Sequence, residues 1–182
     1  MRAIDSNVYR SQAIENTLQL IAGAGKDTKL FPTLRDALSF AATLGYQEGR
    51  KLPLDPNVGR DDIQSPVYNN NEAVDIIFSI GIADTGSVDI LKPENEKDCI
   101  KIFEEYANGG MHLIQEWIEK YADMSIEDAI WRGLKSINFI PEKKDERLSF
   151  IYLFSGLYFS QFFLIISPQK LNHLHHYLML GH

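Results

Sequence analysis

Apolar residues recur at steps of three and four along much of this chain, which is the spacing of one face of an α-helix. The clearest helix begins after Thr33, whose hydroxyl group can accept a hydrogen bond from the first turn, and Asp36 stands where a capping box places its acidic residue. Its apolar stripe consists of Leu34, Ala37, Leu38, Ala41 and Leu44. The small alanine side chains favour close approach of a second helix, and Gly45 is placed to end this one.

The same spacing predicts further helices on both sides. Residues 7–22 are expected to form an amphipathic helix that ends at Gly23. Residues 71–83 predict a largely buried helix, although the run IIFSIGI within them also fits a short buried strand. Residues 94–107 and 111–121 predict two helices joined by a tight corner, because the Asn-Gly-Gly sequence between them interrupts the helical pattern.

One more helix is expected to start at Ser125, with Asp128 three residues on as a second capping pair. Its inward positions are Ile126, Ala129, Ile130 and Leu134, and Gly133 marks a place of close packing. Residues 52–71 are rich in proline and asparagine and predict a loop. The fold class that follows is mainly α: a compact helical bundle of about five to six helices with irregular loops.

The composition changes near Arg147, after which no acidic residue occurs. We therefore divide the chain into a helical domain, 1–146, and an apolar, histidine-bearing tail, 147–182. Within the tail, residues 150–166 are almost wholly apolar and fit three descriptions: a buried hairpin or kinked core element, a membrane tail anchor, or a non-native extension. The tail histidines lack a further ligand type nearby, so they do not predict a metal site.

Charge is distributed unevenly along a chain whose net charge is −7. Residues 1–60 hold eight basic and six acidic side chains, whereas residues 61–146 hold eight basic and nineteen acidic ones. The overall charge argues against a general nucleic-acid binder, because phosphate contacts are made by Lys and Arg. The acidic middle is better suited to a basic protein surface.

Two sets of charged residues are candidates for binding. The basic candidates, for an anion or DNA, are Arg35, Arg50, Lys51 and Arg60. Arg50 and Lys51 follow the end of the helix that Thr33 begins, so they are expected on an exposed turn. The acidic candidates, for a protein partner, are Glu104, Glu105, Glu116 and Glu119.

No arrangement of residues predicts a particular chemistry. The single Cys99 excludes an intramolecular disulfide and a multi-cysteine zinc site, which favours a reducing compartment. The Asp84-Thr85-Gly86 triplet is found around aspartic-protease carboxylates, but that chemistry needs two such loops. His112 lacks an identifiable partner other than Glu116. We therefore expect no catalytic residue, no cofactor and no metal.

Two phrases carry a family resemblance: FAATLGYQEGR, from Phe40 to Arg50, and EYANGG, from Glu105 to Gly110. On these phrases the chain resembles a small family encoded beside DNA phosphorothioation (dnd) gene clusters, the dnd system-associated accessory proteins of the fourth numbered group. The resemblance implies a bacterial or archaeal cytoplasmic protein with a role in phosphorothioate-linked defence against foreign DNA. It implies neither an activity nor catalytic residues.

Three hypotheses about function follow. The first is a non-enzymatic accessory or adaptor protein that acts by protein–protein contact with proteins of the same defence gene cluster. The second is a DNA-contacting regulator that uses the basic turn around Arg50. The third is an uncharacterised enzyme. A membrane partner is expected only if residues 150–166 are a tail anchor, and the sequence leaves the oligomeric state open.

Overall fold

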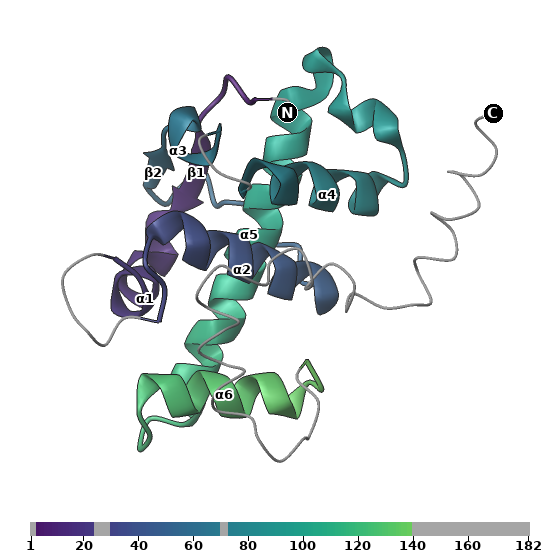
Figure 1. Ribbon diagram of the computed structural model, residues 1–182. Coiled ribbons are helices and arrows are strands. Elements are labelled where there is room, and N and C mark those ends of the chain that lie inside the picture. The colour runs from purple at the N-terminus through teal and green to yellow at the C-terminus, as the bar shows by residue number, and fades with distance from the viewer. Residues whose placement is uncertain (1–2, 24–29, 70–72, 140–182) are drawn as a thin grey trace. The chain divides into compact units, whose positions relative to one another are not determined.

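The computed structural model describes residues 3–23, 30–69 and 73–139. The chain separates into two compact units, Met1–Pro141 and Glu142–His182. All described residues belong to the first unit, which is drawn in colour in Figure 1. The apolar run 150–166 and the tail histidines lie outside the described residues.

The first unit is built around two crossing helices. Helix α5 (Glu96–Lys120) runs its full height, and helix α2 (Leu34–Gln47) crosses the middle of α5 and makes with it the most extensive contact between elements (Figure 1). As expected, Thr33 caps α2, its Oγ1 accepting a hydrogen bond of 3.1 Å from the backbone N–H of Asp36. With α1 to α6 and a single two-stranded sheet among the described residues, the expected mainly α class is confirmed.

The predicted corner at Asn108-Gly109-Gly110 is wrong, because α5 continues through these residues without a break. A Cβ atom on Gly110 would meet the carbonyl oxygen of Ala41 in α2, and one on Gly45 of α2 would lie 3.0 Å from the backbone nitrogen of Gly110. The glycines therefore allow two helix backbones to approach each other. Packing with α2 offsets the lower intrinsic helix propensity of glycine.

The predicted end of α2 at Gly45 is also wrong, since the helix extends to Gln47 and Gly45 is buried within it. Gly49 ends the helix instead, with a φ of +64°. The Gly49 N–H bonds to the Tyr46 carbonyl at 3.1 Å and the Arg50 N–H to the Gly45 carbonyl at 2.8 Å, which is the Schellman pattern. This motif sets the direction in which the chain leaves α2.

Two further predictions of secondary structure fail at a short antiparallel sheet. Residues 7–22 are not one helix but β1 (Val8–Ser11), a 3₁₀ turn and α1 (Glu15–Ile21). Strand β1 pairs with β2 (Arg60–Ile63), so that Val8 lies opposite Ile63. Residues 52–71, predicted as a loop, thus contain β2 and the short helix α3 (Ser65–Asn69). Pairing across some fifty residues overrides the local pattern.

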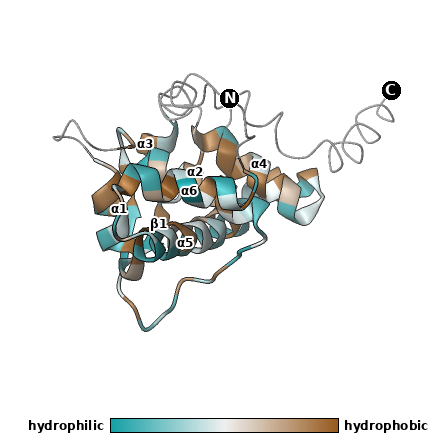
Figure 2. Ribbon diagram, turned by 90° about the horizontal axis from the view of Figure 1, so that it is seen from below, coloured by the Kyte–Doolittle hydropathy of each residue, from teal (hydrophilic) through white to brown (hydrophobic). Residues whose placement is uncertain are grey.

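The remaining helices complete the core. Helix α4 (Ala73–Thr85), buried on most of its surface, packs on α5 and α2, which settles the IIFSIGI run as helical. Two 3₁₀ turns, η2 (Val88–Leu91) and η3 (Pro93–Asn95), lead into α5. Hydrophobic and hydrophilic residues alternate along the helix ribbons in Figure 2, as amphipathic helices around a shared core require.

Helix α6 (Ile126–Ser136) lies at the C-terminal end of α5 (Figure 1). Its expected cap is confirmed, because the Asp128 N–H donates to Ser125 Oγ at 3.1 Å. The predicted close packing at Gly133 is confirmed as well, since a Cβ atom there would meet the ring of Trp117. Among the described residues, no helix is long and apolar enough to cross a membrane.

Candidate interaction site at the exit of helix α2

The chain leaving α2 lies directly on α5. The Leu52 N–H donates to the Glu105 carbonyl at 3.0 Å, and the Asn108 side-chain amide donates to the carbonyls of Leu52 and Pro53 at 3.2 and 3.3 Å. A Cβ atom on Gly109 would meet the Arg50 carbonyl oxygen. Side chains that follow the α2 exit are therefore held against the middle of α5.

Arg50 forms the first ion pair of this site. Its two terminal nitrogens donate to the two carboxylate oxygens of Glu116 at 2.8 and 2.7 Å, a bidentate geometry. The hydrogen bonds from Arg50 hold the pKa of the Glu116 carboxyl below its ordinary value. The pair joins one predicted basic residue to one predicted acidic residue, and it lies at the surface, with the Glu116 side chain 54% exposed.

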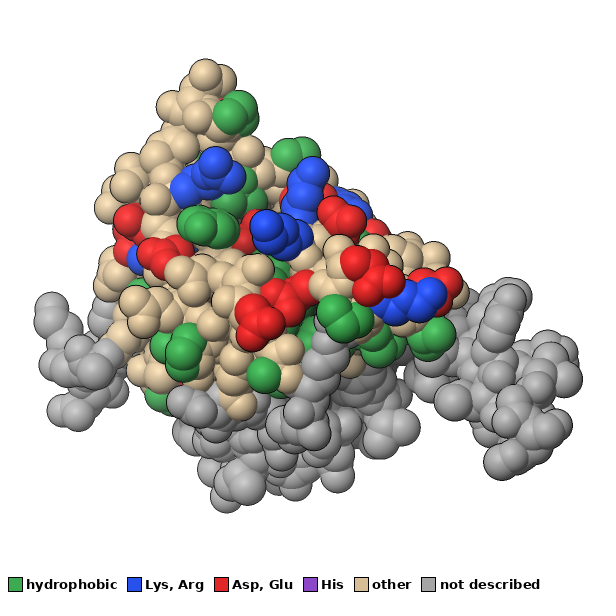
Figure 3. All heavy atoms as spheres, turned by 90° about the horizontal axis from the view of Figure 1, so that it is seen from above, with side chains coloured by type: hydrophobic (Ala, Val, Ile, Leu, Met, Phe, Trp, Pro, Cys, Tyr) green, Lys and Arg blue, Asp and Glu red, His purple; other side chains and the backbone are tan. Residues whose placement is uncertain are grey.

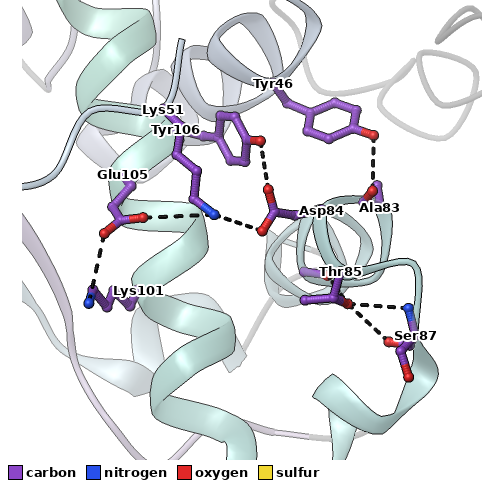
Figure 4. A network of polar contacts seen from close by, with 10 residues as sticks. Tyr46, Lys51, Ala83, Asp84, Thr85, Ser87, Lys101, Glu105 and Tyr106 are labelled. Atoms are coloured by element: carbon purple, nitrogen blue, oxygen red, sulfur yellow. Dashed lines mark hydrogen bonds and ion pairs between the residues drawn. The ribbon is translucent and has the colours of Figure 1, made fainter. Parts of the chain in front are cut away.

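Lys51 enters a second, more buried network (Figure 4). Its ammonium group donates to one carboxylate oxygen of Asp84 at 2.7 Å, while the Tyr106 hydroxyl donates to the other oxygen at 2.7 Å. The ammonium group also lies 3.9 Å from a carboxylate oxygen of Glu105 and 5.4 Å from the centre of the Tyr106 ring. Tyr46 adds an edge-on ring contact with Tyr106, with centroids 5.4 Å apart.

The electrostatics of this network follow from burial and pairing. Burial acts to raise the pKa of Asp84, but hydrogen bonds from Lys51 and Tyr106 and the Lys51 charge outweigh it, and the pKa lies below its ordinary value. Burial and the hydrogen bond to Asp84 raise the pKa of the Tyr106 hydroxyl. Asp84 is therefore ionised and Tyr106 neutral at neutral pH, which suits a fixed ion pair that ties α2, α4 and α5 together.

The other predicted basic residues lie elsewhere. Arg35 donates to the Asp36 carboxylate at 2.7 and 3.0 Å and to the Val67 carbonyl at 3.1 Å, so its guanidinium group is occupied. Arg60 lies on β2, with its guanidinium carbon 5.9 Å from the centre of the Tyr9 ring. The four basic candidates thus form no single patch.

The predicted acidic residues also divide. Glu105 and Glu116 meet the basic residues described above, whereas Glu119 is exposed and accepts a hydrogen bond from Gln115 at 2.9 Å. Glu104 turns toward the sheet, where it accepts a hydrogen bond of 2.6 Å from the Tyr9 N–H. Burial raises the pKa of Glu104 to about 7.

Sequence reasoning missed the two residues at the centre of the Lys51 network. In the sequence, Asp84 stands out only as part of a protease-like triplet, and Tyr106 only as a position within the helix predicted over residues 94–107. The periodic pattern places Tyr106 inward, but it does not show that α4 ends beside that hydroxyl group. Only the packing of α4 on α5 brings the pair together.

The surface at the α2 exit carries both signs of charge, since Arg50, Glu116 and Lys101 are 32, 54 and 70% exposed. Figure 3 shows basic and acidic side chains interspersed on one face of the molecule, seen from above. Over the described ranges, no group of three or more His, Cys, Asp and Glu side chains is arranged to hold a metal ion. The geometry of the α2 exit is that of neutralised ion pairs at a helix junction.

Comparison with known protein families gives a match over most of the chain. The model of the family described as DNA sulphur modification system-associated protein 4 matches residues 7–149, which include every described element. The match includes both phrases, FAATLGYQEGR and EYANGG, and these are the segments that pack together at the α2 exit. No curated protein and no solved structure matches the chain.

Proposed function

Since the chain belongs to the family of DNA sulphur modification system-associated protein 4, we propose that it is a non-enzymatic accessory protein of such a system. In this proposal it acts in the cytoplasm by binding other protein components of the system, in a defence against foreign DNA. The observation that carries the proposal is the pairing of Arg50 with Glu116 and of Lys51 with Asp84.

These ion pairs favour a protein over DNA as the binding partner. A DNA-binding patch needs cations whose donors are directed at phosphate groups, and each phosphate contact contributes to a steep loss of affinity with salt. Arg35, Arg50 and Lys51 instead donate to carboxylates of their own chain. A surface on which both signs alternate is complementary to another protein surface of mixed charge, and it repels a polyanion in part.

The pairs also bear on the enzyme alternative. The Lys51, Asp84 and Tyr106 cluster is the best candidate for chemistry, because its members differ in charge and lie within hydrogen-bonding distance. Each member, however, uses its polar atoms on the others, and the shifts in pKa move Asp84 and Tyr106 away from neutral pH. A general acid or base instead requires a pKa close to the working pH. The arrangement favours a structural role for the cluster.

The test is direct binding between purified proteins. The full chain is mixed in turn with each protein encoded in the same DNA sulphur modification gene cluster, and complexes are measured by size-exclusion chromatography and titration calorimetry. We expect one component to bind with a defined stoichiometry. A chain that binds none of them, singly or in combination, contradicts the proposal.

The same preparation tests the DNA alternative. Direct DNA contact predicts binding to a duplex with a log–log salt slope of magnitude about 0.9 for each phosphate contacted. We expect no such binding at physiological salt. Retention on duplex DNA that is lost on replacing Arg50 and Lys51 by glutamate supports the DNA-contacting regulator instead.

A further inference from the structure

Helix α6 packs against the rest of the unit through one of its faces only, among the described elements. Its buried residues, Ala129, Ile130, Gly133 and Leu134, face α5, and α5 is the one α-helix with which it makes extensive contact among the described elements. Figure 1 shows α6 at the end of α5, away from α4. The opposite side of α6 carries exposed residues that no described element covers, including Glu127 and Arg132.

A cluster of cations around one aromatic ring lies where α5 passes into α6. We refer to Lys120, Tyr121 and Arg132 as the α5–α6 cluster. The Lys120 ammonium group lies 5.2 Å from the centre of the Tyr121 ring, and the Arg132 guanidinium carbon lies 5.7 Å from it. Cations at these distances are attracted by the ring electrons. The ring thus draws together two positive charges, one from each helix.

The backbone holds Tyr121 in place. Its N–H donates to the Trp117 carbonyl at 3.0 Å, and its own carbonyl accepts from the Met124 N–H at 2.9 Å. Ser125 then caps α6, which fixes the start of the helix that carries Arg132. The cluster is therefore positioned by a hydrogen-bonded turn before any partner binds, and less ordering is required on binding.

The cations of the α5–α6 cluster differ from the basic residues at the α2 exit. Arg50 and Lys51 donate to carboxylates of their own chain, whereas Arg60 on β2, like the cluster cations, contacts a ring. Within the described ranges, Lys120 and Arg132 make ring contacts but no hydrogen bond or ion pair, and both are exposed. A ring contact leaves N–H donors available, so these two groups can still bind an anionic group from outside.

The surrounding charges indicate what kind of anion fits. Glu119 and Asp123 flank the cluster along the chain, Glu127 precedes Arg132 on α6, and all three are exposed. A nucleic acid carries one sign of charge and is repelled by these carboxylates. A protein segment with a carboxylate flanked by basic residues satisfies both signs. Tyr and Arg are also the residue types that contribute most to binding at protein interfaces.

We infer that the α5–α6 cluster is a docking surface for a protein segment in which a carboxylate is flanked by basic residues, with Lys120 and Arg132 binding the carboxylate and Tyr121 aligning the two cations. The inference rests on the proposed function, since it specifies the surface through which the accessory protein binds. None of the four basic candidates predicted from the sequence belongs to this cluster, so the inference assigns binding to a different part of the chain.

The test uses the full chain and the purified proteins of the same gene cluster. The variant Lys120→Glu/Arg132→Glu reverses both cations of the α5–α6 cluster. The control variant Lys92→Glu/Lys97→Glu reverses two exposed lysines at the other end of α5. Both variants change the net charge equally, so the comparison removes general electrostatic effects.

We expect the cluster variant to weaken binding of the component that binds the wild-type chain by at least about tenfold, and the control by less than about threefold. Lys120→Arg/Arg132→Lys, which keeps both charges, should retain most of the affinity. Thermal unfolding followed by circular dichroism checks that the variants are folded. Equal affinities of the cluster variant and the control overturn the inference.

The outcomes separate the two proposals. A component that binds the wild-type chain and both variants alike leaves the proposed function intact and overturns the docking surface. A chain that binds no component contradicts both. Salt-dependent binding to single-stranded or duplex DNA, lost in the cluster variant only, assigns the surface to nucleic acid and overturns the protein partner.

Discussion

The Glu104 carboxyl group lies between α5 and β1 and is poorly solvated. It accepts a hydrogen bond of 2.6 Å from the Tyr9 N–H, which favours the ionised form, but burial outweighs this bond and raises the pKa to about 7. The charges that face it include Arg60 on β2 and Glu105 and Lys101 on α5. One residue thus makes the stability of the junction between sheet and helix depend on pH.

Replacing Glu104 by glutamine should stabilise the protein at pH 8. The folded-state pKa lies above the ordinary value of 4.5, so the contribution of Glu104 is complete below about pH 4.5 and is lost as the pH rises to about 7. Glutamine keeps an oxygen acceptor for Tyr9 and removes that loss, about 3 kcal/mol at pH 8. Urea unfolding of both proteins at pH 4 and pH 8 measures the difference.

The control for this experiment is Glu119→Gln, which changes an exposed carboxyl group on the same helix. We expect the two variants to differ at pH 8 and to converge near pH 4. A Glu104→Gln protein that is less stable than the wild type at pH 8 contradicts the assignment. That result means that the hydrogen bond between Tyr9 and the carboxylate outweighs desolvation.

At the scale of elements, local signals predicted well where the interactions are local. Thr33 and Ser125 cap α2 and α6 as expected, because a cap is decided within four residues. The mistakes fall where a distant segment decides. The sequence predicts a helix break at Gly110, but the close approach of Ala41 in α2 requires a glycine within a continuous helix there. It predicts a helix over residues 7–22, but part of this segment forms a strand because it pairs with β2.

The packing of α2 on α5 predicts that replacing Gly110 by alanine lowers the stability of the protein, which is the opposite of the usual effect of this change in a helix. Glycine to alanine in a helix interior ordinarily stabilises by about 1 kcal/mol. At Gly110 the added methyl group would meet the Ala41 carbonyl oxygen, so we expect Gly110→Ala to destabilise by about 1–3 kcal/mol. Urea unfolding measures this loss. Glu119→Ala, an exposed change on the same helix, is the control, and a stabilised Gly110→Ala protein contradicts the close approach.

The candidate site could be predicted only in part, because its residues come together only when the whole molecule folds. The sequence identified Arg50, Lys51, Glu105 and Glu116 as charged residues of interest. It assigns them to separate basic and acidic surfaces, because segments more than fifty residues apart in the chain carry no sign of their contact. The turn at Gly49 and the glycines of α5 bring them together as ion pairs.

The C-terminal boundary of the folding unit can be tested with a shortened chain. The family match ends at residue 149, and the compact unit that holds α1 to α6 ends at Pro141. The core residues of the described elements, such as Phe103, Ile114 and Ile130, are buried within that unit. A fragment of residues 1–149 should therefore unfold in one cooperative transition and remain soluble.

Chemical unfolding of this fragment, followed by both circular dichroism and tryptophan fluorescence, measures that cooperativity. The two signals should coincide, because the ring of Trp117 on α5 lies against Gly133 of α6 and reports on the contact between these helices. A fragment of residues 1–121, which removes α6 and uncovers Trp117, is the matched control and should unfold less sharply. Aggregation of the 1–149 fragment would place part of the later sequence in the core, and the unit would then extend beyond the family match.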